Sequence, residues 1–447
     1  MDKVGRKEYL GITIDYNRES KLDKFSLDTL RDRYFWKEET HAQEALARAA
    51  VFAATYKNNT DFELAQRLYD YSSLHWFMFS TPILSNGGTS RGLPISCFLN
   101  YVPDSRVGLS AHYDENIWLA SAGGGIGGYW GDLRSNGVST SNGSKSTGCI
   151  PFMHVVDSQM LAFNQGVTRR GSYAAYLDVS HPEIEEFLNM RKESGGDINR
   201  KCLNLHNGVN ITNDFLKAIK NDEDWRLIDP KTNKPVKTIN ARSLWWQLIN
   251  ARAETGEPYL INIDTCNEHL PKSQKDLGLE IKQSNLCSEI TLATNEERTA
   301  VCCLSSVNLE KFDEWKDNKL FISDLITMLD NVIQHFIENI VDIEELGEYN
   351  ANYKRFTNYI KEEKEGYQKA AFSAYRERSI GLGAMGFHAY LQSKNVPFEG
   401  MEATGINYRL FKHINSKATK ATQNLADLRG SCPDAGSVHV RNVHLIA

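Results

Sequence analysis

Three residue types with uses in catalysis alternate within the segment QSNLCSEI, residues 283–290. If this segment is extended, the period of two places Asn285, Cys287 and Glu289 on one face. That face then offers an amide for orientation, a thiol for radical or nucleophilic chemistry, and a carboxylate for acid–base chemistry. The same pattern also describes an ordinary polar strand face, so the segment alone leaves both interpretations open.

Two adjacent cysteines, Cys302 and Cys303, follow in a strand-like run. Adjacent strand residues point to opposite faces, so at most one of these thiols can face the same site. The run lacks the CxxC spacing that a structural zinc site prefers. Buried, inert thiols are the usual finding in such a run. We therefore expect no metal site in this run.

A glycine-rich stretch, residues 121–128, contains a formal GxGxxG match. A dinucleotide-binding fingerprint needs a strand before it, a helix after it and an acidic residue about 20 positions on. Here the preceding residues 109–120 are typical of a helix, and residues 136–147 form a polar loop. The stretch instead predicts a helix that ends in glycine, or backbone that approaches a ligand closely.

Composition narrows the class of protein. The chain has 447 residues, 41% hydrophobic and 24% charged, which suits a globular protein of two or three domains. Its net charge of −6, from 51 basic and 57 acidic residues, argues against a duplex nucleic acid partner. No apolar run reaches the roughly 18 residues of a membrane span. With no export signal, we expect a cytoplasmic protein whose eight cysteines are reduced at rest.

The elements that position these residues fall into two predicted domains, 1–80 and 81–447. The first is predicted to be all-helical, because Thr40–Gln43 and Thr60–Glu63 have capping-box spacing before apolar periodic runs. The second alternates strands and helices, which is typical of an α/β layer or barrel. The predicted strands are Ser172–Val179, Val209–Thr212, Tyr259–Ile263 and Thr299–Leu304. The predicted helices are Trp245–Ala253, Asp324–Glu345 with Ser323 as N-cap, and Tyr408–Leu428 ending at Gly430.

The last residues, Val443–Ala447, are typical of a strand that enters a core. One interpretation is a terminal edge strand. The other is that the domain continues in a second polypeptide.

The segments QSNLCSEI and AVCCLSSVNL together resemble the active-site core of the class I ribonucleotide reductase large subunit. Further matching segments are STPILSNGG, PISCFLN, AGGGIG, TGCIPF, NQGVTRRG, YLINIDTCNEH and RSIGLGAMGF, which spread the resemblance over roughly residues 25–435. The fold it implies is α/β: a helical N-terminal layer followed by most of a ten-stranded α/β barrel, with the catalytic cysteine on a central finger loop.

The resemblance implies a role for each matching residue. Cys287 would form a thiyl radical that removes the 3′ hydrogen of the substrate ribose, Asn285 would orient the sugar, and Glu289 would be the base at the 3′ hydroxyl. Cys97 and Cys302 would be the redox pair that ends as a disulfide, and Cys303 would be structural. Substrate contacts would come from Thr81, Ser96, Cys97, Gly125, Asn285, Leu286, Cys287, Ser288 and Glu289. Effector contacts would come from Asp104, Ser105, Arg106 and Arg134, and the specificity loop from Gln165, Arg169 and Arg170.

The implied partners follow from the same resemblance. They are a ribonucleoside diphosphate substrate, a small radical-generating subunit that carries the metal cofactor, thioredoxin or glutaredoxin as reductant, and a second large subunit in a homodimer. Nucleoside triphosphates would be the effectors, and no metal is expected in this chain.

Three departures from the family pattern carry expectations of their own. No ATP-cone precedes the helical layer, so inhibition by dATP is not expected. The resemblance implies an arginine that binds the effector's phosphates, and this chain has Thr140 or Ser141 near that position. Lys145, a few residues on, would be a substitute for it. The family's substrate-phosphate loop, radical-relay tyrosines and C-terminal cysteine pair are missing, so we expect a separate C-terminal fragment, as in phage-like split genes. The alternative is that this sequence is a truncated form of an ordinary longer chain.

Two other functions compete with this interpretation. A cobalamin-dependent reductase would share the barrel, but its relatives usually have proline where Leu286 stands. The other rival is an effector-binding scaffold that is inactive alone.

Overall fold

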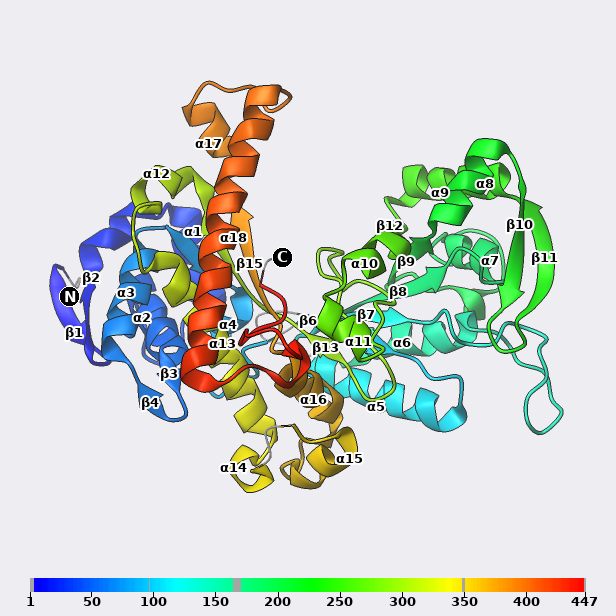
Figure 1. Ribbon diagram of the computed structural model, residues 1–447, viewed down its shortest axis with the longest axis horizontal. Coiled ribbons are helices and arrows are strands. Elements are labelled where there is room, and N and C mark those ends of the chain that lie inside the picture. The colour runs from blue at the N-terminus through cyan, green and yellow to red at the C-terminus, as the bar shows by residue number, and fades with distance from the viewer. Residues whose placement is uncertain (1–3, 96, 164–169, 348–349, 446–447) are drawn as a thin grey trace. The chain divides into compact units, whose positions relative to one another are not determined.

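The computed structural model describes residues 4–95, 97–163, 170–347 and 350–445 (Figure 1). The chain divides into two compact units. The first comprises Met1–Ser96, Cys302–Lys361 and Ala374–Ala447, and the second comprises Cys97–Val301 and Glu362–Ser373. The expected boundary at residue 80 stays a prediction. Within the described residues, none of the helices is both long and apolar enough to cross a membrane.

The second unit is built on a six-stranded sheet with the order β12-β9-β8-β7-β6-β13. Its first five strands are parallel, and β13 pairs antiparallel with β6. The strands are β6 (Cys97–Tyr101), β7 (Gly125–Tyr129), β8 (Ser172–Asp178), β9 (His206–Ile211), β12 (Tyr259–Asn262) and β13 (Ala300–Val301). Parallel neighbours need crossover connections, and helices supply them.

The crossover helices of the second unit pack on its sheet. Among them, α5 contacts β7 and α6 contacts β8. The helices are α5 (Arg106–Ser121), α6 (Ile150–Ala162), α7 (Ile184–Asn189), α8 (Asn213–Asn221), α9 (Ala241–Thr255), α10 (Ile263–His269) and α11 (Lys272–Asp276). A separate hairpin is formed by β10 (Asp224–Asp229) and β11 (Lys234–Asn240).

The first unit is mostly helical around a three-stranded sheet with the order β15-β14-β5. Its strands are β5 (Phe77–Phe79), β14 (Cys303–Asn308) and β15 (Ile380–Met385). Its longer helices are α1 (Lys24–Arg33), α2 (Ala42–Ala53), α3 (Phe62–Ser73), α13 (Phe321–Ile340) and α18 (Met401–Arg429). Figure 1 shows α18 as one long helix coloured orange to red. The short helix α4 (Thr81–Asn86) follows β5.

The expectation of an all-helical opening is wrong in part. Helices α1 to α3 are present, but β1 (Arg6–Tyr9) and β2 (Ile12–Asp15) form an antiparallel hairpin ahead of them. Leu10 and Gly11 both have positive φ in the connecting turn, at 51° and 81°. Alternate residues Ile12 and Ile14 are buried, so the strand has the period-two burial that the helical interpretation overlooked.

Two predicted elements differ from those in the structure. The run Thr299–Leu304 divides into β13 and β14, which belong to different sheets. In the glycine-rich stretch, α5 does end at Ser121, but the following glycines form β7 in the middle of the larger sheet. That placement excludes the dinucleotide fingerprint, because a helix would have to begin where β7 runs.

The capping residues set the helix limits, and one of them differs from its prediction. Helix α1 begins after Asp23, whose side chain accepts from Ser26 N–H at 2.7 Å. Helix α13 begins after Leu320 instead of Ser323. Helix α18 ends at Arg429 and is followed by Gly430 with φ of 81°, as predicted. Near the end of the chain, the His444 carbonyl accepts from Ile380 N–H at 3.1 Å, so this segment extends along β15.

Candidate active site

Residues 282–294 form a loop (the cysteine loop) that doubles back on itself between α11 and β13. Asn285 N–H donates to the Ile290 carbonyl at 3.1 Å, and Ser288 N–H donates to the Asn285 carbonyl at 3.3 Å. Ser288 has φ of 69°, in the left-handed region. The expectation of an extended strand face is therefore wrong. Asn285 points inward and is 1% exposed, whereas Cys287 and Glu289 are exposed near the tip.

The Asn285 side chain connects the cysteine loop to the start of β6. Its Nδ2 donates to Cys97 Sγ at 3.1 Å. Its Oδ1 accepts from the backbone N–H groups of Glu289 and Ile290, each at 3.1 Å. One amide thus fixes the turn that carries Cys287 and contacts a predicted redox cysteine 188 residues away.

Two residues absent from the sequence predictions hold the loop against the sheet. A Cβ on Gly127 would lie 2.0 Å from the Ser284 carbonyl oxygen, so only glycine lets the loop lie on β7. The Tyr176 hydroxyl donates to the Asn285 carbonyl at 2.7 Å. Burial raises the pKa of Tyr176, so the hydroxyl keeps its proton. Gly127 belongs to the glycine-rich stretch 121–128, which predicted a close approach of the backbone. For Tyr176 the sequence predicted a strand and no further role.

The cysteine loop runs from the carboxyl edge of the parallel strands to their amino edge. Near the carboxyl edge, Asn210 Nδ2 donates to the Lys282 carbonyl at 2.7 Å. At the amino edge, the loop reaches Cys97, the first residue of β6, which pairs in register with Gly125, the first residue of β7. Open α/β sheets usually bind ligands at the carboxyl edge. Here the residues suited to chemistry gather at the opposite edge.

The other predicted substrate-site residues are placed as follows. Leu286 packs against the buried cluster of Ala174, Tyr176 and Ile261. Thr81 begins α4 in the first unit, with its Oγ1 3.2 Å from the Tyr34 hydroxyl. Ser96 lies outside the described residues.

The two adjacent cysteines are both buried. Cys302 belongs to the first unit and directly follows Val301, which pairs with Phe98 in the second. Burial raises the pKa of the Cys303 thiol well above its ordinary value, which keeps it protonated, in accord with a structural role. The Cys97–Cys302 disulfide stays a prediction.

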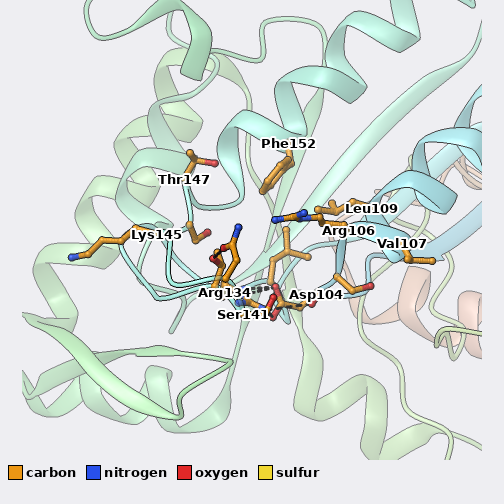
Figure 2. Close-up of a pocket in the computed structure, with 14 residues that line it drawn as sticks. Asp104, Arg106, Val107, Leu109, Arg134, Ser141, Lys145, Thr147 and Phe152 are labelled. Carbon is orange, nitrogen blue, oxygen red and sulfur yellow. Dashed lines mark hydrogen bonds and ion pairs between the residues drawn. The ribbon is translucent and has the colours of Figure 1, made fainter.

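The four predicted effector residues, Asp104, Ser105, Arg106 and Arg134, line one cavity of about 610 Å³ (Figure 2). Arg134 Nε donates to both Asp104 carboxylate oxygens at 3.0 Å, and the shortest contact of this ion pair is 2.8 Å. Ser105 caps α5 by accepting from Gly108 N–H at 2.9 Å. A helix of 16 residues places the positive end of its dipole at this cavity, which favours anions.

The hairpin that supplies the rest of this cavity contains the family's missing arginine position. Thr140, Ser141 and Lys145 all line the cavity. Figure 2 shows the Lys145 side chain pointing away from Arg134 and Asp104, and its role as a substitute for the arginine stays a prediction. Of the predicted specificity loop, Arg170 is described and exposed, and Gln165 and Arg169 lie outside the described residues.

One group in the described part of the chain has donor atoms suited to a metal. Cys149, His181 and Glu183 are buried, with ligand atoms within 4.8 Å of one another. His181 Nε2 lies 2.9 Å from the Leu133 carbonyl, and its Nδ1 accepts from Glu183 N–H at 3.2 Å. The Glu183 carboxylate accepts from Cys149 N–H at 2.9 Å and pairs with Arg200 at 3.2 Å. Burial, then Glu183, raises the pKa of the Cys149 thiol. These bonds engage both ring nitrogens of His181 and the Glu183 carboxylate, which ties the group into a hydrogen-bonded cluster.

Comparison with known proteins gives a consistent picture. Residues 95–444 match the family described as "Ribonucleotide reductase, barrel domain", and residues 20–92 match "Ribonucleotide reductase, all-alpha domain". A relative in Invertebrate iridescent virus 3, a ribonucleoside-diphosphate reductase large subunit, is 41% identical over 98% of this chain and 72% of its own length. A relative in Frog virus 3 (isolate Goorha), which carries the same name provisionally, is 48% identical over 86% of this chain.

This chain spans 63% of the length of the Frog virus 3 relative. Among solved structures, the Actinobacillus ureae class Id ribonucleotide reductase alpha subunit superposes with a TM-score of 0.77 at 31% identity, covering 95% of this chain and 71% of that one. The predicted fold class, a helical layer followed by an α/β barrel, is confirmed by these matches.

Proposed function

The chain belongs to the large-subunit family of class I ribonucleotide reductases, and on that premise we propose that it reduces ribonucleoside diphosphates to deoxyribonucleoside diphosphates for DNA synthesis. The observation that carries the proposal is the contact between Asn285 Nδ2 and Cys97 Sγ at 3.1 Å. It joins the loop of the proposed radical cysteine to a proposed redox cysteine. The GxGxxG match does not support a dinucleotide-dependent mechanism, because its glycines lead into strand β7 and not into a helix.

The proposed chemistry divides the work among three cysteines. A thiyl radical on Cys287 removes the 3′ hydrogen of the ribose while Glu289 accepts the proton of the 3′ hydroxyl. The thiols of Cys97 and Cys302 protonate the 2′ hydroxyl, which leaves as water, and supply the hydrogen that replaces it together with the two electrons. They become a disulfide, Glu289 returns its proton to the 3′ oxygen, and Cys287 returns the 3′ hydrogen and regains its radical. The exposure of Cys287 and Glu289 near the loop tip supports these roles. Phe98 and Val301 are register partners in the sheet; Cys97 directly precedes Phe98, and Cys302 directly follows Val301.

The proposed effector is a nucleoside triphosphate in the cavity beside α5. Asp104, Ser105 and Arg106 would contact its base, and Arg134 and the start of α5 would attract its phosphates. The cavity volume of about 610 Å³ suits a ligand of nucleotide size.

The activity is proposed for an assembly. Its other parts would be the remainder of the family's large subunit, a radical-generating small subunit with its metal cofactor, a second large subunit, and thioredoxin or glutaredoxin as reductant. A C-terminal fragment encoded separately is one source of that remainder. The reduced thiols that this chemistry requires favour the cytoplasm, or the host cytoplasm for a viral protein.

A reduction assay tests the proposal. The chain is combined with the remainder of the large subunit, the small subunit, a dithiol reductant and a ribonucleoside diphosphate, and deoxynucleotide is measured by chromatography. We expect turnover that Cys287→Ser abolishes. Turnover that requires added cobalamin and no small subunit would transfer the chain to the rival reductase class. Triphosphate binding with no turnover in the complete assembly would support the scaffold function instead.

A further inference from the structure

One buried glutamine anchors the base of the cysteine loop. Gln283 is 0% exposed, and its Nε2 donates to the carbonyls of Asn100 at 2.8 Å and Gly127 at 3.3 Å. Its Oε1 accepts from Thr294 Oγ1 at 3.0 Å, which ties the outgoing arm of the loop to the returning arm. We propose that Gln283 is a positioning residue that sets the depth of the cysteine loop on the sheet, and with it the contact between Asn285 and Cys97. This inference rests on the proposed function.

The geometry gives the loop two attachment points on one strand. Gln283 contacts β6 at Asn100, and Asn285 contacts β6 at Cys97. The two strand positions are three residues apart, about 10 Å at the usual rise of a strand. Only Ser284 separates Gln283 from Asn285. If Gln283 shifts relative to Asn100, Asn285 must therefore also move away from the Cys97 thiol.

The hydrogen bonds inside the cysteine loop do not set its depth on the sheet. Ser284 Oγ donates to the Ile290 carbonyl at 2.6 Å, and Asn285 N–H donates to the same carbonyl at 3.1 Å. These bonds close the tip on itself and would survive a sliding motion of the whole loop. A slide must instead break the bonds between the loop and the sheet: those of Gln283 to β6 and β7, and those that Tyr176 and Asn210 donate to the carbonyls of Asn285 and Lys282. Gln283 is the one loop side chain among them that bonds to two strands at once.

Gln283→Met tests the inference, since methionine keeps the length and volume of glutamine and removes its polar atoms. In the complete assembly we expect kcat to fall about 10- to 100-fold, because small misplacements of reacting groups are costly. KM should change less than about threefold, because the substrate contacts themselves are intact. Gln43→Met is the matched control: this glutamine is equally buried, and its Oε1 accepts from the Tyr69 hydroxyl at 2.8 Å in the first unit. It should leave kcat unchanged.

A second measurement needs no turnover. The full chain is treated with iodoacetamide, and the alkylation rate of each cysteine is followed by peptide mass mapping. In Gln283→Met we expect Cys97 to react about tenfold faster than in the wild type, because it loses the cover of Asn285. Cys149, buried in the same unit but bonded to Glu183, is the internal reference and should keep its wild-type rate.

The outcomes separate this inference from the proposed function. A wild-type assembly without turnover would reject the proposed function, and the alkylation rates would still judge the role of Gln283. Lower kcat together with selective exposure of Cys97 supports the inference. A wild-type kcat in Gln283→Met would overturn it. Equal acceleration at Cys97 and Cys149 would also overturn it, because that result indicates general unfolding.

Discussion

Asp330 lies at the centre of a buried ion cluster, and its replacement by asparagine should be the most destabilising single change in the first unit. Its side chain is 0% exposed and contacts Arg378 at 2.7 Å, Arg429 at 2.7 Å and Arg441 at 3.4 Å. Arg378 directly follows α16 (Gln368–Glu377), Arg429 is the last residue of α18, and Arg441 directly precedes residues 442–445. The Asp330 carboxylate therefore connects α13 to three other parts of the unit.

The expected magnitude follows from the imbalance of charge. Asparagine preserves the shape of Asp330 but leaves three guanidinium groups without their shared carboxylate. Removing one partner of a buried ion pair costs about 3–5 kcal/mol. For a domain of about 150–250 residues, that loss corresponds to a fall in Tm of about 6–20 °C. Other acceptors, such as the Gln334 amide oxygen 3.0 Å from Arg378, keep the loss from growing further.

The pH dependence gives the result a second signature. Burial raises the pKa of Asp330, but the charges of Arg378, Arg441 and Arg429 outweigh it and hold the pKa well below its usual range. Since the folded-state pKa is lowered, the stabilisation is complete above the unfolded-state value of about 4. It declines below that value and is fully lost only as the pH falls through the lowered folded-state pKa. The difference between Asp330→Asn and the wild type should therefore shrink at acid pH.

Thermal unfolding followed by circular dichroism at pH 7 and pH 3 measures both effects. The control is Asp313→Asn, because Asp313 pairs with Lys316 and Lys394 at the surface, where ion pairs contribute little. Its Tm should stay close to that of the wild type. If Asp330→Asn unfolds within about 2 °C of the wild type at pH 7, the reasoning about the buried cluster is wrong.

Further predictions concern the site. Cys287→Ser should abolish nucleotide reduction in the assembly and leave the urea midpoint unchanged, because the side chain is exposed; turnover in this variant would reject its role. Gly127→Ala should lower stability by about 1–3 kcal/mol, since the added Cβ would lie 2.0 Å from the Ser284 carbonyl; urea unfolding at the wild-type midpoint would contradict that contact. Arg134→Ala should weaken dTTP binding about 10- to 100-fold in calorimetry, the loss expected for charged hydrogen bonds; an unchanged Kd would place the effector elsewhere. After one turnover without reductant, peptide mapping should find a Cys97–Cys302 disulfide, and a bridge from Cys97 to the neighbouring Cys303 would show that the wrong thiol was chosen.

The sequence by itself determined the residue types of the candidate site and the family. The spacing from Asn285 to Glu289 left a thiol site and a polar strand face both open. The resemblance of this run and of the two adjacent cysteines predicted the family, which the barrel-domain match confirms. Local composition also predicted β8, whose central residues are buried on both faces, and the apolar stripe predicted α13. Asp104 and Arg134 were selected by the same family resemblance, and the structure joins them in an ion pair within one cavity.

Only the tertiary structure decided how the site is held. The period-two interpretation of Asn285, Cys287 and Glu289 assumed an extended backbone, but bonds from Asn285 to Ile290 fold that segment into a turn. The contact between Asn285 and Cys97 joins residues 188 positions apart, and Gln283 reaches Asn100 across 183. No local pattern reports such pairs, because they depend on which strands become neighbours in the sheet. Gly127 of β7 shows the same limit: it is required by the loop that lies on it, which the chain supplies more than 150 residues later.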